Sequence, residues 1–372
     1  MFRAAHSYAT LARWLGPWAS DMAYPRRVTR SCVTVPAPSG DSGAARASFP
    51  AWLYLPPRGR TVRGSYLIAP GLHYAGPADP RMDRLCQILA ASGFVVLAPF
   101  LPDYTSLRVA ATSFEDFRAA FDYIAQLPSL QGGPSPAIFS ISFGSLLALR
   151  LASESAYKHR ISHMILFGGY ADWHEAIMFC LTGEIQGAPH GTRDPLNQPV
   201  VFMNLVDTLP GAPADPTALL AAWRRQVEAT WGRPELKLGE RRLDKARAEA
   251  QSLPSSMREL FLIGCGAAPG AVELCTAALD RAQGRGFMDP RPHMPAITCS
   301  VTLVHGLDDD VIPYVQSEQL AKDLDHVTCQ LYLTGLYGHT AKSGGASFGA
   351  APTLAKELWT MTRILRSFVS AP

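Results

Sequence analysis

The stretch Ala137–Leu149 reads AIFSISFGSLLAL and decides how the rest of the chain is interpreted. An apolar run ends in S-I-S-F-G at positions 140–144, and a helix-forming run follows at once. A strand, a sharp turn with a serine at its tip and a helix together lift the serine hydroxyl clear of a sheet. This turn also directs the first free N–H groups of the helix towards whatever the hydroxyl contacts. The pattern singles out Ser142 as a candidate nucleophile, with a helix N-cap serine as the plainer alternative.

The residues on either side of this serine must be small, because the strand and helix backbones nearly touch at such a turn. The residues two before and two after it are Ser140 and Gly144. Glycine is usual at both positions, so Ser140 departs from the pattern. We expect Ser140 to pack as a substitute for glycine, with its hydroxyl bonded locally and no part in the chemistry.

The bulk composition is that of an ordinary globular protein, with 372 residues, 48% hydrophobic and 17% charged. A net charge of +3 without a Lys/Arg tract argues against a nucleic-acid partner. Seven scattered cysteines without a C-x-x-C pair indicate reduced thiols rather than a disulfide framework or a zinc site. No run approaches the ~20 apolar residues of a membrane helix. We therefore expect no integral membrane segment and a cytoplasmic location.

The first 24 residues predict an amphipathic helical extension. Apolar residues recur at helical spacing opposite two arginines, which favours a helix docked on the body of the protein. A targeting or membrane-surface peptide is the alternative. The sequence does not indicate an oligomeric state. The residues of this pattern are Leu11, Trp14, Leu15 and Trp18, with Arg3 and Arg13 opposite.

The remaining chain predicts an α/β protein with a mostly parallel central sheet. After two hairpin-like strands, strands and helices alternate, which is typical of a parallel sheet with helices on both faces. The predicted strands are 27–35, 51–55, 64–69, 94–99, the run before Ser142, 161–167, 300–304 and 327–333. Between the predicted strands at 161–167 and 300–304, residues 171–295 contain helical segments only. We interpret them as a helical lid inserted between two late strands. Its predicted helices are 173–181, 216–231, 236–251 and 270–283, and its large aromatic residues either border a pocket or pack the lid's own core.

Polar residues also follow two late strands. Three consecutive aspartates, 308–310, come after the strand at 300–304, and His339 comes after the strand at 327–333. The carboxyl ends of parallel strands open on one edge of the sheet, so Ser142, one of these aspartates and His339 can converge there. A serine hydroxyl needs an imidazole to accept its proton, and the imidazole needs a carboxylate to fix its tautomer. The order Ser, Asp, His therefore predicts a catalytic triad.

With these residues the chain resembles the α/β-hydrolase superfamily, over about 27–167 and 300–368. The family pattern G-x-x-D-x-x-V-P matches residues 306–313, with Ile312 in place of valine, and the family's G-H matches 338–339. The resemblance implies Asp309 as the acid. Asp308 is a rival, since one loop insertion would exchange the two. It also implies an α/β-hydrolase core at 25–170 and 296–372, with the cap at 171–295.

The resemblance further implies an oxyanion hole made of two backbone N–H groups. One is the amide of Phe143, directly after the nucleophile. The other is the amide of Leu72, in the sequence P-G-L at 70–72, where proline replaces the histidine usual in the family. His73 and Tyr74 follow and are candidate pocket residues, with packing or surface exposure as the alternative.

The function that this resemblance implies is a serine hydrolase that cleaves carboxylic esters of small-to-medium apolar substrates. The reaction passes through an acyl-enzyme on Ser142 and needs neither a metal nor an organic cofactor. Acyl transfer, or other acyl or carbon–carbon bond chemistry on the same triad, is the alternative, because fold analogy does not separate these reactions. A non-catalytic ligand-binding protein of the same fold is the third interpretation. The partner is in each case a small molecule.

Overall fold

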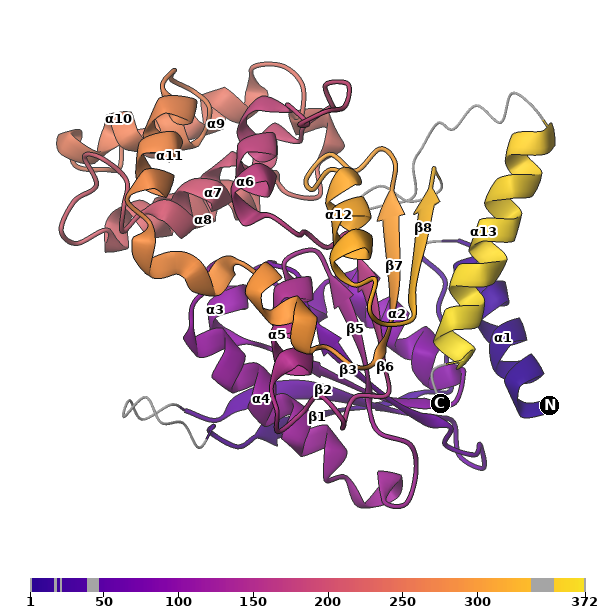
Figure 1. The fold of residues 1–372 in the computed structure, drawn as a ribbon. Coiled ribbons are helices and arrows are strands. Elements are labelled where there is room, and N and C mark those ends of the chain that lie inside the picture. Colours follow the sequence, from indigo (N-terminus) through magenta and orange to yellow (C-terminus); the bar gives the residue numbers. More distant parts are fainter. Residues whose placement is uncertain (1, 17–18, 21, 39–46, 336–350, 371–372) are drawn as a thin grey trace.

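The structure, a computed structural model, describes residues 2–16, 19–20, 22–38, 47–335 and 351–370. Within them, an eight-stranded sheet runs through the molecule in the order β1-β2-β4-β3-β5-β6-β7-β8 (Figure 1). β2 is antiparallel to both of its neighbours, and every pairing from β4 to β8 is parallel. This is the α/β-hydrolase fold, and it confirms the predicted fold class. The strands are β1 (Thr29–Val35), β2 (Phe49–Leu55), β3 (Gly64–Ala69), β4 (Phe94–Pro99), β5 (Ala137–Ile141), β6 (His163–Phe167), β7 (Ser300–Gly306) and β8 (Cys329–Thr334).

The central strands read as continuous apolar runs because both faces of the sheet are covered. Every residue of β3 and β4 is buried. The helices α4 (Thr112–Ala125), α5 (Gly144–Ser153) and α12 (Val315–Asp323) contribute to the buried cluster on one face. The helices α1 (Phe2–Leu15), α2 (Pro80–Ala91) and α13 (Ala351–Ser370) contribute to the cluster on the other. A further short helix, α3 (Pro102–Thr105), follows β4.

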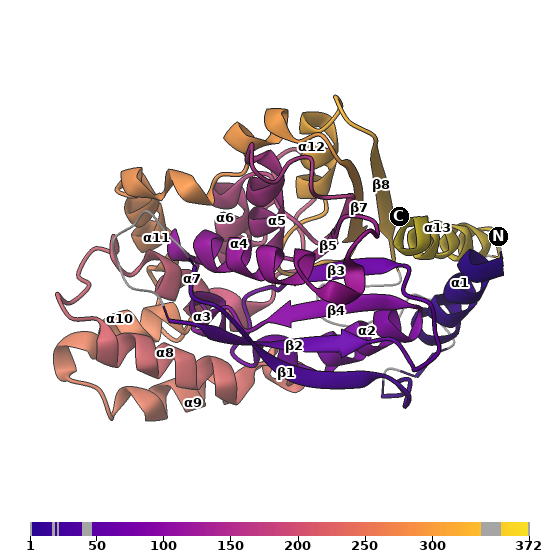
Figure 2. The same ribbon diagram turned by 90° about the horizontal axis from the view of Figure 1, so that it is seen from below.

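The N-terminal helix α1 is docked on the body of the protein. Leu11 is fully buried, and the Ser7 hydroxyl donates a hydrogen bond of 2.6 Å to the carbonyl of Ser92, just after α2. Figure 2 shows α1 and α13 side by side at one end of the molecule, and the helices between β6 and β7 extend to the other end. Trp18, the last residue of the predicted apolar stripe, lies outside the described residues.

The chain leaves the sheet after β6, forms helices only, and returns at β7. We call helices α6–α11 the cap. The sequence predicted four of them, but not α7 or α10. Every residue of α7 is buried, so this helix has no polar face and no helical period to detect. The cap helices are α6 (Trp173–Thr182), α7 (Gln198–Leu205), α8 (Thr217–Thr230), α9 (Arg241–Ala250), α10 (Ser255–Gly264) and α11 (Ala271–Asp280).

The cap and the sheet share one hydrophobic cluster. Leu147 of α5 and Met164 of β6 belong to the same cluster as Phe202 of α7 and Trp223 of α8. The cap is therefore packed onto the carboxyl edge of the sheet rather than attached only by its two chain connections.

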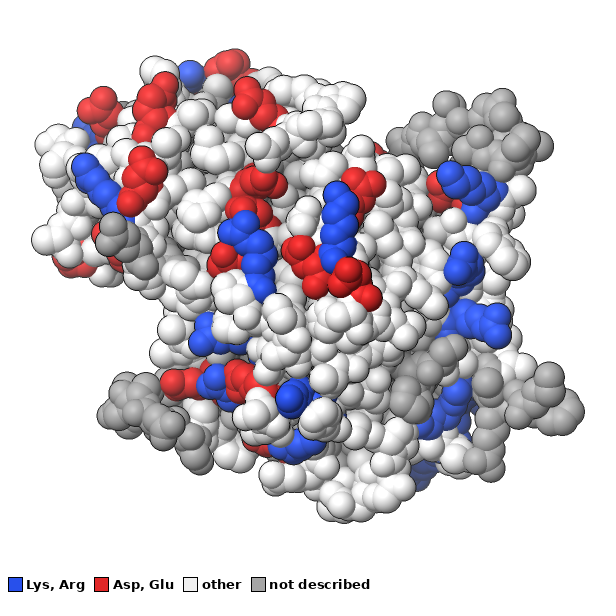
Figure 3. Space-filling model, viewed as in Figure 1, with Lys and Arg blue, Asp and Glu red and all other residues white. Residues whose placement is uncertain are grey.

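The surface carries charges of both signs. On the face in Figure 3, basic and acidic side chains are interspersed over the cap and the sheet-bearing part. Several are paired, as in Arg118–Glu154 at 2.6 Å and Arg225–Glu249 at 2.7 Å. None of the described helices combines the length and the apolar character needed to cross a membrane.

Candidate active site

The turn between β5 and α5 has the geometry that its sequence predicted. Ser142 has a φ of +53°, a left-handed conformation that costs a non-glycine residue about 1–2 kcal/mol. A Cβ added to Gly144 would lie 2.2 Å from the carbonyl oxygen of Ala69, at the end of β3. Only glycine fits there, because the start of α5 passes directly over the end of β3. The serine is therefore held in a strained turn between two closely approaching backbones.

Ser140 differs from our expectation in one respect. Its side chain is fully buried in β5, where the residue pairs with Leu166 of β6 and Ala69 of β3. The expected local hydrogen bond is wrong, since the Ser140 hydroxyl has no partner among the described residues. Strand pairing uses the backbone of β5, and the apolar neighbours offer the hydroxyl no acceptor. Ser140 fills the space of a glycine at the expense of an unpaired polar atom.

Two backbone amides near the turn at Ser142 donate no hydrogen bond within the part of the chain that the structure describes. The loop after β3 passes close to the serine, because a Cβ added to Gly71 would lie 3.4 Å from the Ser142 Cβ. Leu72 follows in this loop, and Phe143 follows the serine. Neither the Leu72 nor the Phe143 amide donates a hydrogen bond to any described residue, whereas the Ser142 amide donates to the Phe167 carbonyl at 2.9 Å. An oxyanion hole requires unpaired N–H groups, so these two amides stay its predicted donors.

The acidic turn after β7 contains three consecutive aspartates, 308–310, which differ in their exposure to solvent. Asp309 is 6% exposed, and its Oδ1 accepts hydrogen bonds of 2.9 Å from the amides of Val311 and Ile312. Its Oδ2 lies 3.3 Å from Nε2 of His305. Asp308 is exposed. The buried Asp309 carboxylate is thus fixed in place.

His305 is a buried structural partner of this turn. Its Nε2 donates to the Ile312 carbonyl at 2.8 Å, and its Nδ1 lies 2.6 Å from the Ser317 hydroxyl. Both ring nitrogens of His305 are therefore held by the acidic turn and α12, and the ring supports the position of Asp309.

The structure brings Ser142 and Asp309 to the same edge of the sheet, at the carboxyl ends of β5 and β7. One strand, β6, separates them, and neighbouring strands lie about 4.8 Å apart. His339 follows β8, the neighbour of β7, but it lies outside the described residues. The role of His339 therefore stays a prediction from the sequence.

Two tyrosines that the predicted site does not include brace the turn. The Tyr104 hydroxyl donates to the carbonyl of Phe143 at 3.1 Å. The ring of Tyr170 packs on the ring of Phe143, with 4.9 Å between centroids. Burial raises the pKa of both hydroxyls, so both tyrosines stay protonated. Tyr104 follows the fourth strand at the same sheet edge, a position at which the sequence allows a substrate contact. Tyr170 has no sequence signal, because it is identified only by its contact with Phe143.

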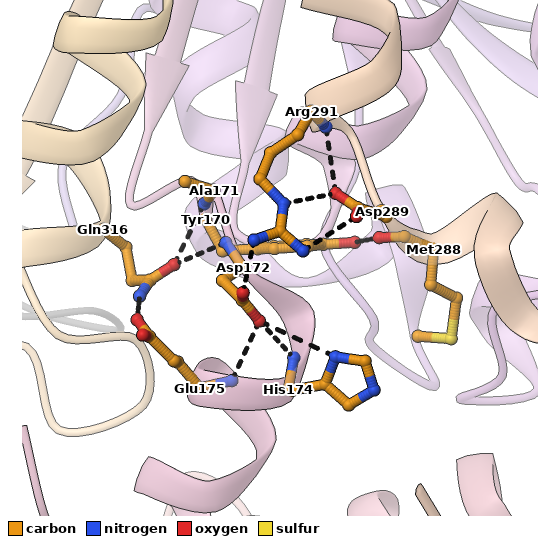
Figure 4. Close-up of polar contacts among 9 residues, drawn as sticks. All are labelled: Tyr170, Ala171, Asp172, His174, Glu175, Met288, Asp289, Arg291 and Gln316. Carbon is orange, nitrogen blue, oxygen red and sulfur yellow. Dashed lines mark hydrogen bonds and ion pairs between the residues drawn. The ribbon is translucent and has the colours of Figure 1, made fainter. Parts of the chain in front are cut away.

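Tyr170 also joins the turn to the point where the chain enters and leaves the cap (Figure 4). Its hydroxyl donates to the carbonyl of Met288 at 2.9 Å. Nearby, Arg291 forms ion pairs with Asp172 at 2.7 Å and with Asp289 at 2.8 Å. These contacts connect the segment that enters the cap, at 170–172, to the segment that leaves it, at 288–291.

The side chain of Gln316 in α12 binds the same segment. Its Oε1 accepts hydrogen bonds from the amides of Ala171 and Asp172, and its Nε2 donates to Glu175 at 2.7 Å (Figure 4). The start of α6 is therefore fixed to the sheet-bearing part of the protein as well as to the end of the cap.

The cap is held to the acidic turn by a second set of contacts. Lys237 forms an ion pair with Asp194 at 2.9 Å and a shorter one with Asp310. Burial opposes the charge of Lys237, but its hydrogen bonds with the two carboxylates outweigh burial and raise its pKa. Cys180 of α6 donates its thiol to the Val311 carbonyl at 3.2 Å. The residues on the carboxyl side of Asp309 are thus clamped from the cap.

A third set holds the cap to the loop after α3. Asn204 of α7 is 5% exposed, and its side chain accepts from the Val109 amide and donates to the Leu107 carbonyl, both at 2.8 Å. Arg224 of α8 donates to the Thr105 carbonyl at 2.9 Å. With these contacts the cap covers the sheet edge on both sides of Ser142, which is 6% exposed.

His73 and Tyr74 lie in the loop after β3, where this loop meets the cap. Their rings are stacked, with 4.6 Å between centroids and 24° between planes. His73 accepts the Ala75 amide at Nδ1, and its Nε2 lies 3.3 Å from Asp79. Burial lowers the pKa of His73 despite the nearby Asp79, so the imidazole is neutral at pH 7.

Two hollows of about 500 and 630 Å³ lie beside α6, and Glu175 and Gln186 line both. Ser142 lines neither. Among the described residues, no group of three or more His, Cys, Asp or Glu side chains is arranged to hold a metal ion.

No protein-family model matches the chain, and no curated protein matches it in sequence. Several solved structures are similar. An esterase from Pyrococcus furiosus is 13% identical, with a TM-score of 0.49 over 96% of this chain and 94% of its own. A dienelactone hydrolase from Anabaena variabilis is 11% identical, with a TM-score of 0.43 over 92% of this chain and 97% of its own. An acylaminoacyl peptidase from Pyrococcus horikoshii is 13% identical, with a TM-score of 0.45 over 92% of this chain, which spans only 41% of the peptidase's length.

Proposed function

We propose that the protein is a serine hydrolase that cleaves carboxylic esters of small-to-medium apolar substrates. The observation that carries this proposal is the strained Ser142, which is followed by one unpaired backbone amide and approached by the loop that carries a second. A strained backbone conformation persists where the surrounding structure enforces it, and such conformations cluster at active sites. The buried Asp309 at the same sheet edge adds support.

In the proposed reaction, the Ser142 hydroxyl attacks the ester carbonyl while His339 accepts its proton. The amides of Phe143 and Leu72 donate to the oxyanion of the tetrahedral intermediate. The alkoxide leaves with the proton from His339, and an acyl-enzyme remains on Ser142. Water then repeats the attack, which releases the carboxylic acid and restores the serine. No metal or organic cofactor takes part in this scheme.

Asp309 is the proposed partner that orients His339. Its burial and its fixed Oδ1 favour it over Asp308, which is exposed to solvent. An exposed carboxylate is screened by water and stabilises an imidazolium less. We further propose that residues 171–295 form the cap and that 25–170 and 296–372 form the catalytic core.

A fluorophosphonate probe tests the proposal directly, because it labels only an activated serine. We expect the wild-type protein to be labelled and Ser142→Ala not to be. Asp309→Asn should label at least tenfold more slowly, whereas Asp308→Asn should label at the wild-type rate. Ser140→Ala is the matched control, since it removes a buried hydroxyl two residues away, and it should keep full labelling. Equal labelling of Ser142→Ala, or none of the wild type, contradicts the hydrolase and leaves a non-catalytic binding protein.

Acyl transfer is the second candidate, and the burial of Ser142 under a docked cap favours it. An acyl-enzyme that excludes water reacts with an alcohol instead. Hydrolysis in the presence of a competing alcohol separates the two activities. A product that is mostly free acid supports the hydrolase, and a product that is mostly the new ester supports the transferase.

A further inference from the structure

Three aromatic rings meet where the loop after β3 faces the cap. The stacked rings of His73 and Tyr74 come from this loop, and Trp231 comes from the end of α8 in the cap. The Trp231 ring lies 5.5 Å from the His73 ring and 6.3 Å from the Tyr74 ring, with interplanar angles of 36° and 38°. These residues form one cluster, which we call the seam cluster. It spans the boundary between cap and sheet edge.

The seam cluster differs from the other large aromatic side chains of the cap. Those on the helices α6, α7, α8 and α10 pack the interior of the cap and are at most 3% exposed, whereas all three rings of the seam cluster are partly exposed. Large aromatic side chains left partly open at a boundary offer a free apolar face to a ligand. The buried aromatic side chains are Trp173, Phe179, Phe202, Trp223 and Phe261.

Hydrogen bonds hold the seam cluster in place. Trp231 donates its indole N–H to the carbonyl of Leu196 at 2.9 Å. His73 is fixed at both ring nitrogens, by the Ala75 amide and by Asp79. Asp79 is in turn paired with Arg81 at 2.7 Å. The rings therefore need little ordering when a ligand binds.

The seam cluster lies close to the proposed oxyanion hole. His73 directly follows Leu72, and Gly71 of the same loop packs against Ser142. An acyl group on Ser142, or the alcohol that leaves it, extends from the carbonyl carbon along one of the two sides of this loop. On the side that carries His73 and Tyr74, such a group would meet aromatic rings.

We propose that the seam cluster binds an aromatic ring of the substrate, in either its acyl or its alcohol part, by stacking. This inference rests on the proposed hydrolase function and names the class of ester. Stacking of an aromatic ring on an aromatic wall favours it over a saturated ring of equal size by about three- to tenfold. Trp231 is the residue that decides the preference for aromatic substrates, because it is the ring of the seam cluster that comes from the cap.

The test compares esters that differ only in aromaticity. Ethyl phenylacetate is paired with ethyl cyclohexylacetate, and benzyl acetate with cyclohexylmethyl acetate, and kcat/KM is measured by proton release. In the wild type we expect the aromatic member of at least one pair to be favoured three- to tenfold. Trp231→Leu should bring that ratio close to one, and Trp231→Phe should keep most of it. Trp52→Leu is the matched control, since Trp52 is a partly buried tryptophan on β2, and its ratio should equal that of the wild type.

Two outcomes overturn the inference: a ratio near one in the wild type for both pairs, or an unchanged ratio in Trp231→Leu. If Trp231→Leu does not fold, Tyr74→Leu replaces it with the same expected loss. A wild-type protein that the fluorophosphonate does not label refutes the proposed function itself. A labelled protein without aromatic preference refutes the seam cluster alone.

Discussion

Replacing Gly144 with alanine tests whether the close contact between α5 and β3 positions the proposed site. The added Cβ would lie 2.2 Å from the Ala69 carbonyl oxygen and 2.6 Å from that of Pro70. Non-bonded heavy atoms are most favourable at about 3.5 Å or more. The start of α5 and the end of β3 must therefore separate by about 1 Å. Because Pro70 precedes Gly71 and Leu72, this separation moves the Leu72 amide away from Ser142.

The size of the effect follows from this displacement. A misplacement of about 1 Å costs roughly a hundredfold in rate, and loss of one oxyanion donor costs about 10²–10³ in kcat. We expect Gly144→Ala to lower kcat by about a hundredfold. Overpacking should lower the free energy of unfolding by about 1–3 kcal/mol, of which the better helix propensity of alanine recovers up to about 1 kcal/mol.

The assay is kcat on the best ester together with the rate of fluorophosphonate labelling, both measured on protein shown to be folded by circular dichroism. Gly284→Ala is the matched control, because a Cβ added at this glycine meets nothing within 4 Å. It should keep the wild-type rate. If folded Gly144→Ala labels and turns over within twofold of the wild type, the contact does not position the oxyanion hole and our reasoning is wrong.

Other predictions concern charge, pH and thiols. Lys237→Met removes the cation that pairs with Asp194 and Asp310. Denaturant titration should show that the free energy of unfolding falls by about 1–2 kcal/mol, a value already discounted for the 31% exposure of Lys237. Lys237→Arg should keep most of the stability. Burial lowers the pKa of His163 from 6.5 to about 4, so the unfolded chain takes up the proton first as pH falls. The free energy of unfolding should therefore drop by about 3 kcal/mol between pH 6.5 and pH 4, and His163→Gln should remove that part of the slope. A chromogenic disulfide at pH 8 should react quickly with one thiol, that of the exposed Cys32, and Cys32→Ser should abolish the fast phase. Cys329 is partly buried and its pKa is raised to about 11, and five cysteines are buried, so several fast thiols in the folded protein would contradict this reasoning.

The fold was predictable because its signals are local. The buried strands β3 and β4 read as unbroken apolar runs, and the turn at Ser142 follows from small residues around a serine. Ser142 and Asp309 stand at the strand ends where the sequence placed them, and their catalytic roles stay predictions. Helix α7 was missed because all of its residues are buried, so its composition shows no polar face.

The surroundings of the site were not predictable, because they depend on contacts between residues far apart in the chain. Tyr170 is identified only by its packing on Phe143, and Lys237 only by its pairing with Asp310. Trp231 has no feature in sequence that separates it from the five buried aromatic residues of the cap. The unpaired hydroxyl of Ser140 has the same cause, since a sequence does not say whether an acceptor is near.

The adjacency of β6 and β7 has a consequence for how this protein can change over evolution. His163 and Ser300 face each other across these two strands, although 137 positions separate them in the chain. Loop-closure entropy grows only with the logarithm of length, so replacing this connection with a ten-residue linker would recover only about 2 kcal/mol. The thermodynamic coupling between cap and sheet therefore resides mainly in the contacts between them, apolar and polar, and little resides in the connection itself. A lineage can lengthen, shorten or exchange the cap at small entropic cost, provided that the replacement covers the same apolar edge.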